Sequence, residues 1–191
     1  MTNPFEEEIK KANAVLREGG TILYPTDTIW GIGCDATNAK AVEKIFELKK
    51  RNENKSLIVL VDDDSRLQRY VKEVPSNAWD LIEYSDRPLT IIYPKGVSLP
   101  PTVIAADGSV AIRIVKDEFC KQLIRRLNKP LISTSANFSN EPTPFNFNEI
   151  DAAVLEAVDY VVNLRQNEKN NSQPSVILRL ELNGKIKFIR K

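Results

Sequence analysis

The sequence contains no histidine, one methionine and only two cysteines among its 191 residues. The absence of histidine removes the commonest general base and the commonest metal ligand of proteins. The two cysteines, Cys34 and Cys120, lack the short spacing of a metal site, so we expect reduced thiols in a cytoplasmic protein. Any chemistry must therefore depend on lysine, arginine, aspartate, hydroxyl groups, backbone groups, the substrate itself or a bound metal ion.

Excess charge and long apolar runs are also absent. Lysine and arginine number 27 against 26 for aspartate and glutamate, so the net charge is +1 and any cationic site must be local. No apolar run approaches the length of a transmembrane helix, and the first residues, MTNPFE, do not form a signal peptide. We therefore expect a cytoplasmic protein with no membrane partner, folded as one domain over residues 1–191.

Apolar periodicity predicts alternating helices and strands. Helical patterns indicate helices at 5–17, 39–50, 65–71, 76–84, 118–127 and 147–158. Apolar runs indicate strands at 21–24, 57–61, 89–93, 110–115, 130–132, 175–180 and 185–189. Residues 26–37 are expected to form a loop, and Asn183-Gly184 is a strong hairpin signal between the last two strands. The predicted fold class is α/β, a single domain with a mixed sheet.

Small polar side chains gather in residues 133–137, Ser-Thr-Ser-Ala-Asn, directly after the apolar run 130–132. The C-terminal ends of strands are where open α/β sheets place their ligands. Hydroxyl and amide groups there can bind phosphate, ribose or carboxylate without carrying charge. The alternative is an ordinary polar turn, since serine and asparagine favour turns.

Four other stretches are candidates, each with a structural alternative. Residues 24–31 combine hydroxyls, a carboxylate and a glycine that permits close approach of a ligand, or form a turn in which Asp27 bonds the backbone. The cations of residues 49–56 could grip a phosphate, or complete a helix end whose dipole favours them. Arg113 is a charge within an apolar strand and needs an internal or a ligand carboxylate. The aspartates at 62–64 could hold a metal ion, but helix capping explains them more simply.

In this order, the stretches resemble the YrdC-like family of threonylcarbamoyl-AMP synthases, also called TsaC. The family motifs have counterparts at residues 25–33, 49–52, 111–113, 135–137 and 174–177, so the resemblance covers nearly the whole chain. Each motif is weak alone, whereas five in order at matching spacing form a strong signal. Leu60 stands where the family often has histidine.

The resemblance implies a twisted, open, mixed sheet around a concave, positively lined cavity. It also implies an enzyme, a nucleotidyltransferase that converts L-threonine, bicarbonate and ATP into L-threonylcarbamoyl-AMP and pyrophosphate. The product would supply the threonylcarbamoyladenosine modification next to the anticodon of tRNA. The expected partners are the three substrates and the downstream tRNA threonylcarbamoyltransferase, with weak or no direct binding of tRNA. Mg²⁺ is expected with ATP, held largely by ATP itself.

The same resemblance implies roles for individual residues. Lys49 and Arg51 would be catalytic. The ATP site would comprise Arg51, Lys55, Ser109, Ser135, Asn137, Thr143 and Arg190. The L-threonine site would comprise Thr28, Leu60, Arg113, Ser133 and Ser175, with Leu60 contributing only by packing. No residue is expected to ligate a metal.

Two rival functions are open to the sequence. The first is an RNA-binding protein whose cationic cavity accepts phosphates without catalysis. The near-neutral net charge and the lack of an aromatic and basic stacking platform argue against it. The second is a carbamoyl-adenylate module of the hydrogenase-maturation kind, which is usually part of a much longer chain.

Overall fold

The computed structural model describes residues 4–50, 57–168 and 173–191. Its helices are α1 (Pro4–Arg17), α2 (Ala39–Lys49), α3 (Asp64–Gln68), α4 (Asn77–Glu83), α5 (Glu118–Leu127) and α6 (Ala152–Ala157), with a 3-10 turn η1 (Phe147–Glu149). Its strands are β1 (Ile22–Tyr24), β2 (Gly31–Gly33), β3 (Ile58–Val61), β4 (Leu89–Tyr93), β5 (Val110–Ile114), β6 (Leu131–Ser135), β7 (Tyr160–Val161), β8 (Val176–Leu180) and β9 (Ile186–Arg190). No helix in these ranges is both long and apolar enough to cross a bilayer.

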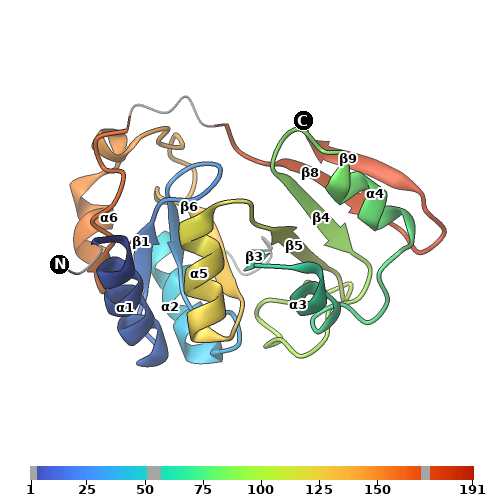
Figure 1. The fold of residues 1–191 in the computed structure, drawn as a ribbon, viewed down its shortest axis with the longest axis horizontal. Helices are drawn as coiled ribbons and strands as arrows, with labels where there is room; N and C mark the ends of the chain where they lie inside the picture. Colours follow the sequence, from blue (N-terminus) through green and yellow to red (C-terminus); the bar gives the residue numbers. More distant parts are fainter. Residues whose placement is uncertain (1–3, 51–56, 169–172) are drawn as a thin grey trace.

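The strands pair into one sheet, in the order β7-β1-β2-β6-β3-β5-β4-β8-β9 (Figure 1). β3 pairs parallel with β5 and β4 parallel with β8, whereas β4 and β5 are antiparallel. β8 and β9 form an antiparallel hairpin, and Gly184 in its turn has a φ of 82°. The predicted mixed α/β fold with an open sheet is therefore confirmed.

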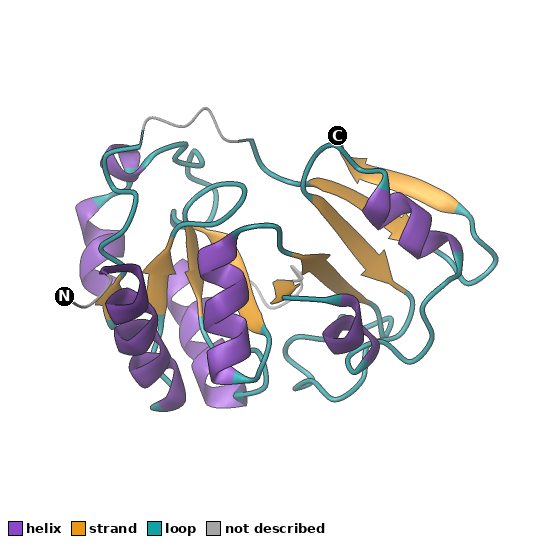
Figure 2. Cartoon of the chain, viewed as in Figure 1, coloured by secondary structure: helices purple, strands orange, loops and turns teal. Residues whose placement is uncertain are grey.

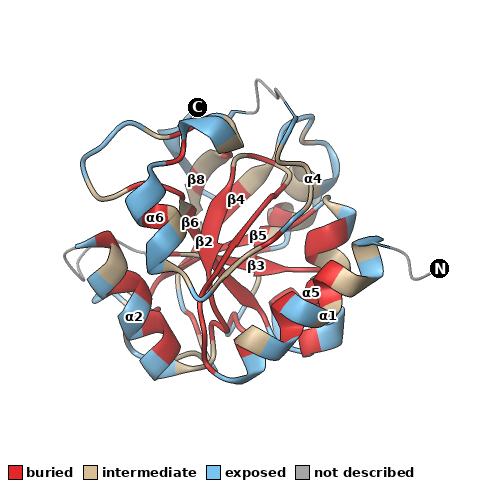
Figure 3. Ribbon diagram, turned by 90° about the vertical axis from the view of Figure 1, so that its left-hand side faces the viewer, coloured by how far each residue is buried: buried red, intermediate tan, exposed pale blue. Residues whose placement is uncertain are grey.

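Helices cover both faces of one half of the sheet. α1 and α5 pack together, and the Phe5 ring lies edge-on to Phe119 with 5.8 Å between ring centroids. They share a buried cluster with Tyr24 of β1, whereas Leu23 belongs to a second cluster with Ile45 of α2. Figure 3 shows α1 and α5 on one side of these strands and α2 on the other. The other half carries α4 beside β8 and β9 (Figure 2). The half covered by α1 and α5 is the one that bears most of the candidate site.

Three local predictions are wrong. Residues 26–37 are not all loop, because Gly31–Gly33 form β2 between β1 and β6. The polar run begins inside β6 rather than after it, since Ser133 pairs with β3 and Ser135 with β2. The predicted helix 147–158 is interrupted at Ile150, whose extended backbone is followed by Asp151, the N-cap of α6.

Strand β2 depends on glycine for its close fit. A Cβ at Gly33 would lie 2.2 Å from the Ile132 carbonyl oxygen and 2.8 Å from the Tyr24 ring. The Tyr24 hydroxyl donates to that same carbonyl at 3.0 Å, so the ring crosses the space that a side chain at position 33 would need. Glycine is therefore required by the close approach of two backbones and a ring.

A buried carboxylate joins α1 to the sheet edge and gives a pH-dependent stability. Glu8 accepts hydrogen bonds from the Tyr160 hydroxyl at 2.6 Å, the Asn163 amide at 2.8 Å and Lys11 at 3.0 Å. Burial acts to raise the pKa of Glu8, but these hydrogen bonds outweigh it and leave the pKa below its ordinary value of 4.5. The ionised form is thus favoured by folding.

We expect Glu8→Gln to lower the free energy of unfolding by about 1–2 kcal/mol at neutral pH, the worth of charge-assisted hydrogen bonds. Because folding lowers the pKa, this stabilisation is present above the ordinary pKa and is lost as the pH falls through the folded value. Urea unfolding of both proteins at neutral pH and at about pH 4 measures the change. Glu7→Gln on the same helix is the control, and a difference that does not shrink on acidification would contradict the assignment.

Candidate functional site

A cavity of about 300 Å³ opens on the face of the sheet against which α1 and α5 pack, beyond the part that these helices cover. Side chains at 131, 133 and 135 of β6 point to this one face. Leu131 packs in the cluster with α5, whereas Ser133 and Ser135 line the cavity. The hydroxyls predicted from the sequence are thus presented by a strand, where the helical cover stops.

The structure brings most of the predicted residues to this cavity. Those that line it are Thr28, Arg113, Ser133, Ser135, Thr143, Ser175 and Arg190. They come from β5, β6, β9 and three loops that are far apart in the chain. Among the described residues lining the cavity, the charged ones are Arg113 and Arg190.

Arg113 is buried at the cavity wall with one nitrogen uncommitted. Its side chain is 3% exposed, and Nη2 lies 3.1 Å from a carboxylate oxygen of Asp27 and donates to the Thr28 hydroxyl at 3.3 Å. Within the described part of the chain, Nε of Arg113 has no hydrogen-bond acceptor. A buried donor without a partner is costly, which favours an anionic ligand such as a carboxylate.

Arg190 faces the cavity from the last strand. Its guanidinium donates to the Ser175 carbonyl at 2.9 Å and to the Ser175 hydroxyl at 3.2 Å. Burial, together with the nearby charge of Arg113, lowers the pKa of Arg190. An arginine stays protonated at physiological pH, so the two guanidiniums repel each other and a bound anion would relieve that repulsion.

Lys49 is directed at the turn after β6. It is 2% exposed, and its ammonium donates to the Ser135 carbonyl at 2.7 Å, to Oδ1 of Asn137 at 2.8 Å and to the Asn137 carbonyl. The Asn137 amide donates in turn to the Glu141 carbonyl at 2.7 Å. Lys49 therefore fixes the turn that leads from Ser135 to Thr143, and neither it nor Asn137 is among the residues lining the cavity.

Other predicted residues lie elsewhere. Arg51 and Lys55 fall outside the described residues. The Ser109 hydroxyl donates to Asp107 at 2.6 Å, and this bond, with that from Arg179, lowers the pKa of Asp107 to about 2. Ser109 is not among the residues that line the cavity.

Leu60, predicted to pack against the threonine pocket, lies in the hydrophobic core. Leu60 pairs with Arg113 across the β3–β5 ladder. It is completely buried in the cluster that α5 covers, and it is not one of the cavity residues. Packing against α5 therefore makes Leu60 part of the hydrophobic core.

Within the run of aspartates at 62–64, Asp62 and Asp63 stabilise the fold through ion pairs and a helix cap. Asp63 is the N-cap of α3 and accepts from the Arg66 amide at 2.7 Å, and Asp62 pairs with Arg66 and Arg125. In the described ranges, no group of three histidine, cysteine or acidic residues could hold a metal ion. The side chains of Asp62 and Asp63 are thus engaged by arginines and a backbone amide of the fold.

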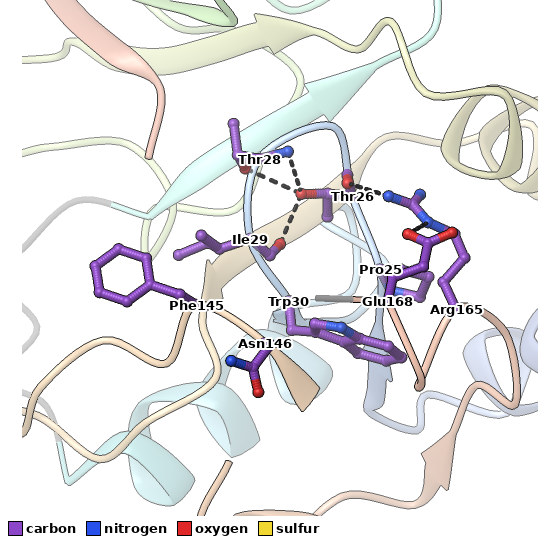
Figure 4. Close-up of a pocket in the computed structure, with 9 residues that line it drawn as sticks. All are labelled: Pro25, Thr26, Thr28, Ile29, Trp30, Phe145, Asn146, Arg165 and Glu168. Atoms are coloured by element: carbon purple, nitrogen blue, oxygen red, sulfur yellow. Dashed lines mark hydrogen bonds and ion pairs between the residues drawn. The ribbon is translucent and has the colours of Figure 1, made fainter. Parts of the chain in front are cut away.

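Sequence reasoning missed a second group of residues beside the cavity. A pocket of about 20 Å³ shares Thr28, Ile29 and Trp30 with the cavity and adds Arg165 and Glu168 (Figure 4). The Trp30 ring lies 4.9 Å from that of Phe147, centroid to centroid. A lone arginine in a long polar loop gives no sequence signal, so Arg165 could only be found from its contacts.

Comparison with known proteins relates this geometry to one family. The family model Sua5_yciO_yrdC, described as telomere recombination, matches residues 14–191. A threonylcarbamoyl-AMP synthase of Pseudoalteromonas translucida is 31% identical over 184 residues, which are 95% of this chain and 97% of the relative. A putative threonylcarbamoyl-AMP synthase of Methanocaldococcus jannaschii is 36% identical over 193 residues, covering 97% of this chain and 88% of the relative.

A solved structure agrees with the sequence relatives. P. abyssi Sua5 complexed with L-threonine superimposes with a TM-score of 0.78 at 26% identity. The match covers 94% of this chain and 52% of the Sua5 chain, so this chain spans about half the length of that protein.

Proposed function

Because this chain belongs to the Sua5/YciO/YrdC family, we propose that it is an L-threonylcarbamoyl-AMP synthase, a nucleotidyltransferase acting on L-threonine, bicarbonate and ATP. The observation that carries the proposal is the buried Arg113, which lines the cavity beside hydroxyl groups and has an unpaired Nε. An amino acid offers a carboxylate for that guanidinium and leaves its amine free to react.

The reaction requires positioning more than acid–base chemistry. The threonine amine and bicarbonate condense to a carbamate with loss of water. A carbamate oxygen then attacks the α-phosphorus of ATP, the bond to the bridging oxygen breaks and pyrophosphate leaves. The protein has to hold two anions together and neutralise charge on the phosphates, which a site without histidine can do.

The cavity residues divide between the two substrates. We assign Thr28, Arg113, Ser133 and Ser175 to L-threonine, and Ser135, Thr143 and Arg190 to the nucleotide. Arg51 and Lys55 remain proposed phosphate ligands on the sequence motif alone. The catalytic role predicted for Lys49 becomes, from its contacts, that of holding the turn from Ser135 to Asn137 in place. Mg²⁺ bound with ATP would supply further charge neutralisation, and a downstream tRNA threonylcarbamoyltransferase stays an expected partner.

An RNA-binding protein without catalysis is not favoured. The relatives that match over most of this chain are named as synthases, and the two arginines in the cavity lie among hydroxyl and apolar side chains. A cytoplasmic location accords with the proposed role in tRNA modification.

The test of the proposal is pyrophosphate release from ATP. We expect release to require both bicarbonate and L-threonine, because the carbamate is the nucleophile. L-serine should be a poorer substrate by about 10- to 200-fold in kcat/KM, the usual worth of one methyl group in an apolar pocket. Coupled phosphate detection and mass spectrometry of the adenylate measure both points, and equal turnover without any amino acid would contradict the proposal.

Smaller effects are expected at the turn after β6. Ser135→Ala should weaken the binding of a non-hydrolysable ATP analogue by about 2- to 12-fold, the worth of one hydrogen bond. Asn137→Ala should have an effect of similar size through the turn that positions Ser135, since Asn137 itself does not line the cavity. The double variant should lose less than the sum, because the Ser135 hydroxyl donates to Asn137 Oδ1 at 2.6 Å. Calorimetric titration decides this, with Ser139→Ala on the same segment as control. Unchanged affinity in both single variants would show that the nucleotide binds elsewhere.

A further inference from the structure

The segment that follows β7 is bonded to the loop that carries Thr28. Arg165, in this segment, has a φ of 58°, a left-handed conformation that is uncommon for a residue other than glycine. Its guanidinium pairs with Asp117 at 2.6 Å and with Glu168 at 2.9 Å, and it donates to the Thr26 carbonyl at 3.4 Å. One side chain thus joins this segment, the start of α5 and the Thr28 loop.

The Thr26 side chain continues the connection to the cavity (Figure 4). Its hydroxyl accepts from the Thr28 amide at 3.0 Å, bonds the Thr28 hydroxyl at 2.9 Å and donates to the Ile29 carbonyl at 2.7 Å. The Thr28 hydroxyl in turn accepts from Arg113 at 3.3 Å. A continuous path of polar contacts therefore runs from Arg165 through Thr26 and Thr28 to the buried guanidinium.

We propose that Arg165 is a positioning residue for the amino-acid substrate, holding the loop of residues 26–29 so that Thr28 and Arg113 keep the geometry that recognises it. The proposal rests on the proposed function for the identity of the substrate. Arg165 lines the neighbouring pocket of about 20 Å³, not the cavity of about 300 Å³. The small pocket has room for about one water molecule, so Arg165 acts through the loop and does not touch the amino acid.

Asp117 orients the guanidinium from the opposite side. One of its oxygens accepts from the Cys120 amide at 2.9 Å as the N-cap of α5, and the other pairs with Arg165. Asparagine can keep the cap, since asparagine and aspartate are both favoured N-cap residues, but it removes the charge. Asp117→Asn should therefore weaken the hold on Arg165 while α5 stays folded.

The variant for the test is Arg165→Met, which keeps the length of the side chain and removes its donors. We expect the Kd and the KM for L-threonine to rise about tenfold, with the KM for ATP within about twofold, because a misplaced positioning group costs substrate alignment. Asp117→Asn should shift the same constants in the same direction. The double variant should cost less than the sum, since residues in contact couple.

Arg125→Met is the matched control. Arg125 makes an arginine–aspartate pair with Asp62 near the other end of α5, and it is not among the residues lining the cavity. Asp62 keeps Arg66 as a partner, so the control should leave both KM values and the melting temperature close to those of the parent protein.

A second measurement does not depend on the substrate. Amide hydrogen exchange of the unliganded protein should quicken in residues 26–29 of Arg165→Met and not in Arg125→Met. A parent protein that neither binds nor turns over L-threonine would overturn the proposed function, whereas exchange alone decides whether Arg165 holds the loop. Unchanged exchange with unchanged L-threonine affinity, or an equal rise of both KM values, would overturn the positioning role.

Discussion

Arg113→Gln should lower kcat/KM for L-threonine by about 10²- to 10³-fold, the usual effect of removing a preorganised charged donor from a site of this kind. The reason is geometric. Nη2 is engaged by Asp27 and Thr28, and Nε, which has no acceptor in the described structure, belongs to the same planar guanidinium, whose geometry matches a carboxylate. Arg113→Lys should recover little, because an ammonium restores the charge without the fork. Steady-state pyrophosphate release against L-threonine concentration measures the loss.

The same change also affects folding, and the two effects can be separated. Removing the guanidinium leaves Asp27, whose side chain is 9% exposed, without its cation, at a cost of about 3–5 kcal/mol. Asp27→Asn combined with Arg113→Gln removes the unpaired charge and should restore much of the stability without restoring activity. A well-folded double variant with parental kcat/KM would refute the assignment of the amino-acid carboxylate to Arg113.

Lys49→Met should cause the second large loss, in stability and activity together. The change keeps the volume of the side chain but deprives the Ser135 and Asn137 oxygens of their charged donor. Each buried acceptor left unsatisfied costs about 1–3 kcal/mol, so we expect a loss of roughly 3–5 kcal/mol in the free energy of unfolding. Urea unfolding followed by circular dichroism measures it.

The neighbouring Lys50 provides the control for Lys49. Lys50 is exposed, and its ammonium lies 5.7 Å from the centroid of the Phe138 ring. Lys50→Met should change stability by less than about 1 kcal/mol, as exposed cation–π contacts do. If Lys49 served the phosphates alone, Lys49→Met would melt like the parent protein, and that result would exclude the role in holding the turn.

Long apolar patterns in the sequence predict the framework accurately. Residues 89–93 and 118–127 form β4 and α5 with the expected bounds, because the strand is rich in β-branched and aromatic residues and the helix has an amphipathic pattern with Asp117 as its cap. β2 and β7 were missed for the opposite reason. They have three and two residues, too few to give a periodic pattern, and each pairs with a strand far along the chain, β2 with β6 and β7 with β1.

The candidate site shows the same division. Hydroxyls and arginines could be proposed from motif order, and the cavity collects Thr28, Ser133 and Arg113 from three separate segments. The hydrogen-bond partners of each side chain could not be predicted from the sequence. Lys49 and Leu60 were expected near the substrates. Lys49 instead donates to the turn after β6, and Leu60 is buried in the core under α5.

The strand order also constrains how the chain can be made. Both outer positions of the sheet, β7 at one end and β8–β9 at the other, come from residues 160–190. A ribosome releases these residues after β1–β6, so the outer edges of β1 and β4 have no partner while the strands between them are already available. Unpaired strands of a partly synthesised chain invite pairing with other chains. The segment that covers both edges of the sheet also delivers Ser175 and Arg190 to the cavity, so the site is complete only after the edges are paired.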